Sequence, residues 1–177
     1  MGKYSYIAKL FAEAGYDVVG YDSYGFGMSI GDRGTIRVME NYYDDGYCFV
    51  EKVRDFYLQK LGEMPKIIAF GYSLGARVAV AISNLSRKKA GADFFSAMLL
   101  QCPALKTRAD LQPVADGVAS LVATAPDKFY DMPVKERNED YSFLWTPYFD
   151  PVFYPGPYTV NSLYQLFKEC DYLDKEL

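Results

Sequence analysis

The fold is decided by residues 66–75, which read Lys66-Ile67-Ile68-Ala69-Phe70-Gly71-Tyr72-Ser73-Leu74-Gly75. The first half is a continuous apolar run, which is typical of a strand in a parallel sheet covered on both faces. The second half is a G-x-S-x-G pentapeptide, and the alanine-rich segment that follows predicts a helix to about Arg87. A serine at a sharp strand-to-helix turn adopts a strained backbone, and side chains two residues on either side would collide. Gly71 and Gly75 remove that collision, so the sequence predicts an elbow that exposes the Ser73 hydroxyl.

This turn carries the candidate catalytic chemistry. The helix after it points its first amides at the turn, so the Leu74 N–H can bind a developing oxyanion. Ser73 is therefore the candidate nucleophile. Tyr72, beside it, is expected to pack or to line a pocket rather than to titrate. The alternative is a purely structural turn, in which the Ser73 hydroxyl caps the following helix.

The first two thirds of the chain alternate helices and strands in a way that predicts an α/β fold. We expect helices over about 6–14 and 35–61, and further strands at Asp17–Tyr21 and Ala97–Gln101. Such alternation implies parallel strands joined by right-handed crossovers. Residues 1–105 are therefore predicted to form a partial α/β core of three parallel strands with flanking helices.

The composition changes after Pro103, where eight of the nine prolines and many aromatic residues lie. Helices are expected at about 110–121 and 159–172, and no strand is predicted. We interpret residues 106–177 as a mostly helical cap. Its aromatic residues, between Phe129 and Tyr158, fit either the lining of an acyl-chain pocket or the core of a small domain.

Charge and cysteine usage exclude several kinds of partner. The net charge of −4 and the absence of a basic cluster argue against nucleic acid. Cys48, Cys102 and Cys170 are scattered and odd in number, so neither a disulfide framework nor a metal site is indicated, and a cytoplasmic location is expected. No apolar run approaches the roughly 20 residues needed to span a bilayer. No cofactor is predicted.

The chain contains no histidine. Histidine is the usual general base near neutral pH, because its unperturbed pKa lies in that range. This absence limits the chemistry that these 177 residues can perform alone.

Several segments resemble, in the same order, the monoacylglycerol lipase and serine aminopeptidase (S33) family of α/β-hydrolases. The resemblance extends over nearly the whole chain. Ser23-Tyr24 departs from the family pattern, which has an aromatic residue or histidine followed by arginine at that point. The matching segments are Phe11–Asp22 with Gly25, Gly27 and Ser29 (D-x-R-G-x-G-x-S in the family), Ile67–Gly75 (G-x-S-[ML]-G), Gln101–Leu105 (S-A-P-A-L) and the cap-helix stretch Tyr158–Leu177.

The resemblance implies a serine hydrolase that acts on carboxylic esters such as monoacylglycerols or lysophospholipids. Its partner would be a small acyl ester, and a transient contact of the cap with a lipid surface is compatible with it. Triads of this fold run in the order serine, acid, histidine, and only Ser73 has a matching position here. The alternative is a non-catalytic relative that binds a lipid-like ligand or a protein partner. A peptidase or a transacylase stays open within the family.

The resemblance also implies that the sequence is part of a longer hydrolase. In the family, an early strand lies between those expected at Asp17–Tyr21 and Lys66–Phe70. Without it, these two strands would be about 9–10 Å apart, twice the usual spacing. Either the two strands close up, or the sheet stays open with unpaired backbone groups.

Overall fold

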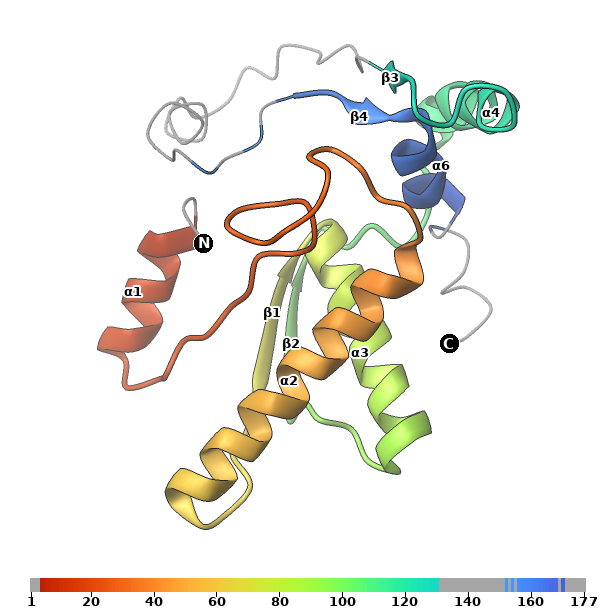
Figure 1. Ribbon diagram of the computed structural model, residues 1–177. Helices are drawn as coiled ribbons and strands as arrows, with labels where there is room; N and C mark the ends of the chain where they lie inside the picture. The colour runs from red at the N-terminus through yellow and green to blue at the C-terminus, as the bar shows by residue number, and fades with distance from the viewer. Residues whose placement is uncertain (1–3, 131–151, 153, 155, 169, 171–177) are drawn as a thin grey trace.

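The computed structural model describes residues 4–130, 152, 154, 156–168 and 170. Figure 1 shows a small parallel sheet with two long helices on one side and a short N-terminal helix on the other. The described elements after residue 108, which we call the cap, lie above the carboxyl ends of the strands (Figure 1). The expected aromatic residues at 131–151 and 153 lie outside the described part of the chain. The elements are α1 (Ser5–Glu13), α2 (Met39–Leu61), β1 (Ile68–Tyr72), α3 (Leu74–Ala90), β2 (Ala97–Gln101), η2 (Ala109–Leu111), α4 (Gln112–Leu121), β3 (Phe129–Tyr130), β4 (Tyr158–Thr159) and α6 (Val160–Lys168).

The sheet consists of β1 and β2, which pair in parallel. The register sets Ile68 opposite Ala97 and Tyr72 opposite Gln101. The helix α3 connects the two strands and packs against them, while α2 packs against α3. This strand–helix–strand unit confirms the α/β arrangement that the sequence predicts, and it places the 66–75 turn at the carboxyl end of β1.

The third expected strand, at Asp17–Tyr21, is not formed. The segment has no strand structure, and Val18 and Val19 are 38% and 50% exposed. Figure 1 shows it lying apart from β1, which pairs only with β2 among the described residues. An apolar run can favour a strand, but a strand needs a neighbour to pair with its backbone groups. The prediction for this segment was therefore wrong, and the sheet stays open.

The main core lies between α2 and α3. Gly46 of α2 sits against α3, where an added Cβ would come within 2.7 Å of the Ile82 Cδ1. A side chain at this position would push the two helices apart, so glycine permits their close approach. The buried members of this core are Ile36, Met39, Tyr42, Tyr43, Tyr47, Val50, Val78, Ala81, Ile82 and Phe94.

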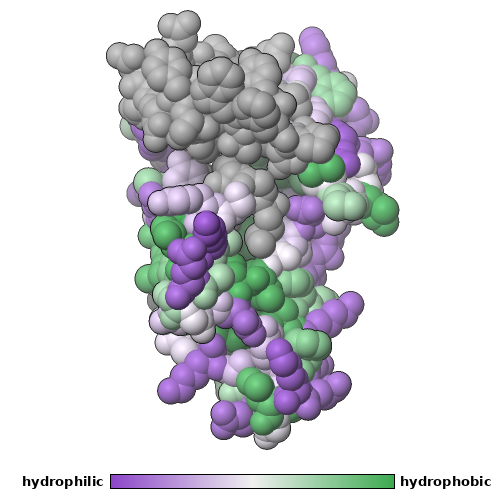
Figure 2. All heavy atoms as spheres, turned by 90° about the vertical axis from the view of Figure 1, so that its left-hand side faces the viewer, coloured by the Kyte–Doolittle hydropathy of each residue, from purple (hydrophilic) through white to green (hydrophobic). Residues whose placement is uncertain are grey.

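The other face of the sheet is largely uncovered. Alternate residues of the strands, Ile68, Phe70 and Leu99, are exposed there. Phe70 has aromatic contacts at this face, because its ring lies 6.2 Å from that of Tyr4, just before α1, and 6.3 Å from that of Phe11 in α1. Figure 2 shows apolar residues gathered on this side of the molecule. Parallel sheets are normally covered on both faces, so this face departs from the usual rule.

The cap has a small core of its own between α4 and α6. Val118, Val160 and Leu163 are its buried members. The helices expected at 110–121 and 159–172 correspond to α4 and α6. The helix α6 ends at Lys168, and residues 169, 171 and 172 lie outside the described part. The antiparallel pair of β3 with β4 was missed. Two-residue strands are too short to show any periodicity in the sequence.

A fully buried serine, Ser162, joins the cap to the loop before α2. Its hydroxyl donates to the Gly34 carbonyl at 2.9 Å and accepts from the Ile36 N–H at 2.6 Å. Thr159 caps α6, because its Oγ1 accepts from the Ser162 N–H at 3.2 Å. Asn161 adds a bond from its side-chain amide to the Ile36 carbonyl at 2.9 Å. The N-terminus of α6 is thus held to the core by side chains that satisfy loop backbone groups.

Replacing Ser162 with alanine should lower the free energy of unfolding by about 1–3 kcal/mol, because buried backbone groups of Gly34 and Ile36 would lose a partner. Ser120 provides the control: its hydroxyl also bonds a carbonyl, that of Asp116, but on the exposed surface of α4. Urea unfolding of both variants measures the difference. Equal, small losses would contradict the assigned role of Ser162.

Candidate active site

Ser73 occupies the turn between β1 and α3 in a strained conformation. Its φ is 53° and its ψ is −114°. Conformations of this kind cost on the order of 1–3 kcal/mol and persist only where neighbouring groups hold them. Here the Ser73 N–H donates to the Gln101 carbonyl at 2.9 Å, which ties the turn to the end of β2.

The carbonyl of Ser73 is held even more firmly. It accepts hydrogen bonds from the backbone amides of Ala76 at 3.1 Å, Arg77 at 3.3 Å and Ala104 at 3.3 Å. The first two amides belong to α3, and the third belongs to the loop after β2. The Ser73 peptide is therefore fixed from two directions.

The Ser73 side chain does not cap α3. The residue stands at the N-cap position, but its hydroxyl forms no capping hydrogen bond with the helix. A capping serine would instead accept from the second or third amide of the helix. The structural-turn alternative, in which Ser73 serves only as a cap, is not what the geometry shows.

The two glycines of the pentapeptide have different roles. An added Cβ at Gly71 would lie 2.6 Å from the Ala76 Cα and from the Gly75 carbonyl oxygen. An added Cβ at Gly75 would meet nothing within 4 Å. The expectation that both positions exclude a side chain holds for Gly71 and fails for Gly75, whose Cβ direction faces open space.

The residues on either side of Ser73 belong to the strand and the helix that the turn connects. Leu74 is the first residue of α3, so its N–H has no acceptor within the helix. Tyr72 is the last residue of β1 and is half-buried opposite Gln101. The helix dipole adds positive potential at this end of α3.

No role at the turn was predicted from the sequence for three nearby residues. Cys102, just after β2, is exposed and has a φ of 45°, so strained residues follow both strands of the sheet. Ala104 holds the Ser73 carbonyl, and Arg77 is buried one turn into α3. The sequence does contain a signal that Arg77 is buried, because it is a charged residue within a run of small and apolar ones.

The glycine-rich turn at 22–31 is organised by Asp22. The carboxylate accepts from the Met28 N–H at 3.1 Å, and the Asp22 carbonyl accepts from the Ser29 hydroxyl at 2.6 Å. An added Cβ at Gly27 would collide with the Asp22 carboxylate. The aspartate, glycine and serine of the D-x-R-G-x-G-x-S resemblance therefore hold one another in the turn.

The tyrosines packed around this turn are poor candidates for a general base. Burial raises the pKa of Tyr42, whose hydroxyl donates to the Tyr24 carbonyl at 2.8 Å. Burial likewise raises the pKa of Tyr21 and of Tyr158. A higher pKa disfavours the phenolate at neutral pH, so these groups act as neutral hydrogen-bonding and packing residues.

Within the described ranges, no group of histidine, cysteine, aspartate and glutamate side chains is arranged to hold a metal ion. Over the same residues, no helix combines the length and apolar character needed to cross a bilayer.

The family model for serine aminopeptidase S33 matches residues 1–174. The chain belongs to this family. It is 26% identical over 144 residues to phospholipase YtpA of Bacillus subtilis (strain 168), which corresponds to 78% of this chain and 51% of that protein.

Two solved structures share the α/β-hydrolase fold. A monoacylglycerol lipase of Paleococcus ferrophilus superimposes with a TM-score of 0.64 at 22% identity, over 99% of this chain and 63% of its own. A thermostable carboxyl esterase of Bacillus coagulans, solved with glycerol, superimposes with a TM-score of 0.62 at 17% identity. The match covers 97% of this chain and 60% of the esterase chain. The S33 chain thus spans about half to two thirds of the length of these relatives.

The difference in space around Gly71 and Gly75 can be tested by unfolding the two alanine variants. Gly71→Ala should lower the free energy of unfolding by about 1–3 kcal/mol, since its methyl group would press on the backbone of α3. Gly75→Ala should leave stability unchanged or raise it by about 0.5–1 kcal/mol, because it lies in a helix with open space around it. Thermal and urea unfolding of the two variants report the difference. Equal destabilisation by both substitutions would contradict the described packing.

Proposed function

We propose that this S33 chain carries the nucleophile, Ser73, and one oxyanion donor, the Leu74 N–H, of a serine hydrolase acting on carboxylic esters. One observation carries the proposal. The Ser73 hydroxyl forms no capping bond to α3, and its residue is held in a strained conformation at the end of β1. A residue needed only for helix capping would have no reason to adopt this backbone.

In the proposed reaction, Ser73 Oγ attacks the acyl carbonyl while a general base removes its proton. The negative charge on the carbonyl oxygen is stabilised by the Leu74 N–H and by the N-terminus of α3. The intermediate collapses, the C–O bond to the alcohol breaks, and the base returns the proton to the leaving oxygen. Water then releases the acid from the acyl-enzyme by the same steps in reverse.

The base and its acid partner would lie on polypeptide beyond these 177 residues. The chain has no histidine, and its buried tyrosines have raised pKa values. A triad in the order serine, acid, histidine is compatible with this arrangement, because only its first member falls here.

The proposed substrates are monoacylglycerols, lysophospholipids or similar small esters. This proposal is supported by the names of the relatives, a phospholipase, a monoacylglycerol lipase and a carboxyl esterase. We propose that residues 106–177 form the cap above the site, that residues 1–105 form the core, and that the enzyme works in the cytoplasm. The cap would set the choice of acyl group.

A fluorophosphonate probe should label the complete gene product at Ser73, because the probe reacts with activated serines. Labelling should disappear in Ser73→Ala and persist in Ser120→Ala, which removes an exposed hydroxyl on α4. Peptide mass spectrometry locates the adduct. Labelling that survives in Ser73→Ala would sink the assignment.

The 177-residue chain alone should hydrolyse p-nitrophenyl acetate at a rate close to that of its Ser73→Ala variant. The reason is that removing the base of a triad abolishes most of the rate, and what remains comes from binding and the oxyanion hole. Turnover well above the variant's would show that a base other than histidine operates within this chain.

A further inference from the structure

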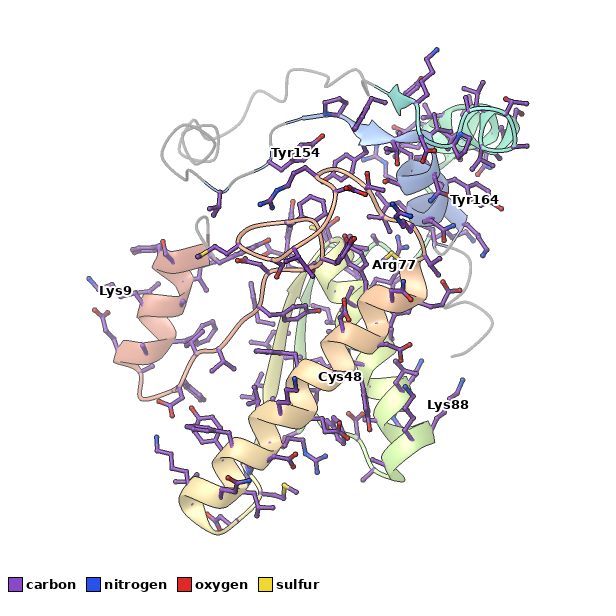
Figure 3. The ribbon with its side chains drawn as sticks, viewed as in Figure 1. Lys9, Cys48, Arg77, Lys88, Tyr154 and Tyr164 are labelled. Carbon is purple, nitrogen blue, oxygen red and sulfur yellow. The ribbon has the colours of Figure 1, made fainter. Side chains whose placement is uncertain are left out.

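Arg77 is a buried cation one turn into the helix that follows Ser73. It is 1% exposed and is the largest fully buried side chain of the described structure. Figure 3 shows it between the upper end of α3 and the cap helix α6. No carboxylate in the described part of the chain forms an ion pair with it. Burying a charge without a counter-ion among the described residues is costly, so its retention needs an explanation.

The guanidinium joins three separate segments. Its Nε donates to the Ala104 carbonyl at 2.8 Å, in the loop after β2. One Nη donates to the Leu166 carbonyl of α6 at 3.0 Å, and the other to the Cys170 Sγ at 3.0 Å. The planar fork of arginine suits such divergent acceptors, and a lysine ammonium cannot reach them all.

The contact with Ala104 leads back to Ser73. Arg77 holds the carbonyl of Ala104, and the N–H of the same residue, in the preceding peptide unit, donates to the Ser73 carbonyl at 3.3 Å. That carbonyl belongs to the same rigid peptide unit as the Leu74 N–H, and the two point in opposite directions in a trans peptide. Whatever fixes the Ser73 carbonyl therefore fixes the direction of the Leu74 N–H.

We propose that Arg77 is a positioning residue that aligns the Leu74 N–H for oxyanion binding through Ala104 and couples this alignment to the docking of α6. The inference rests on the proposed function for its catalytic consequence, but its structural part does not. Arg77 contacts no reacting atom in this scheme. It sets the orientation of a backbone donor and makes that orientation depend on the cap.

Amide hydrogen exchange of the 177-residue chain tests the structural part without requiring activity. Arg77→Met keeps the length of the side chain and removes all its donors. Exchange at Ala104 and along the last turn of α6 should rise by about ten- to a hundredfold, the loss expected for hydrogen bonds from a charged donor. Exchange at Ile82, in the core of α3, should change much less. Equal acceleration at all three places would overturn the proposal, because it would reduce Arg77 to a contributor to global stability.

Two further variants keep the test decisive. Arg77→Lys retains a cation, so it serves if the methionine variant does not fold; it should give an intermediate acceleration at Ala104. Ser162→Ala is the matched control, because it loosens the other end of α6 without touching Ala104. It should accelerate exchange at the N-terminal end of α6 and raise exchange at Ala104 by much less than Arg77→Met does, because the bond from Arg77 to the Ala104 carbonyl is retained. Acceleration at Ala104 as large as that in Arg77→Met would contradict a specific role for Arg77.

The catalytic part is read from fluorophosphonate labelling of the complete gene product. In Arg77→Met, the maximal labelling rate constant should fall by about tenfold or more, as for a misplaced oxyanion donor, and the half-saturating probe concentration should stay constant. An unchanged rate constant together with accelerated exchange at Ala104 would refute the catalytic link. If the unsubstituted protein is not labelled, the proposed function fails, while the exchange data still decide whether Arg77 positions the turn.

Discussion

The peptide unit between Ser73 and Leu74 is the constraint on which the rest of the site depends. Its carbonyl accepts from two amides of α3 and from the Ala104 amide, while the Ser73 N–H donates to Gln101 at the end of β2. Together these bonds hold a backbone conformation that an isolated chain would avoid. The parallel pairing of β1 with β2 is therefore more than a scaffold, because it brings Gln101 and Ala104 to the turn.

The cap is joined to this constraint at two points. Ser162 binds the N-terminal end of α6 to the loop before α2, and Arg77 binds its other end to the loop after β2. Leu166, whose carbonyl accepts from Arg77, packs against both hydrophobic clusters. The helix α6 is thus anchored to the core at both ends. This S33 chain holds Ser73 in a fixed backbone conformation, although one face of its sheet is apolar and exposed and the segment at 17–21 forms no strand.

The sequence predicted the parts of the fold that depend on local signals. The apolar run and the pentapeptide at 66–75 place β1, Ser73 and α3 correctly, since strand, turn and helix are each encoded by adjacent residues. The segment at 17–21 was mispredicted, because its apolar pattern says nothing about whether a neighbouring strand is present to pair with it. The prediction that Gly75 excludes a side chain failed for a similar reason, because the space beside it depends on which other segments pack there. The roles of Arg77 and Ala104 come from contacts between residues 27 positions apart, which no local pattern contains.

The central claim is that Ser73 and the Leu74 N–H act together on an acyl group. A crystal structure of the complete gene product inactivated with a phosphonate tests it most directly. The account predicts phosphorus bonded to Ser73 Oγ and a phosphoryl oxygen about 2.7–3.1 Å from the Leu74 nitrogen. An adduct on another residue, or a phosphoryl oxygen turned away from the N-terminus of α3, would contradict it.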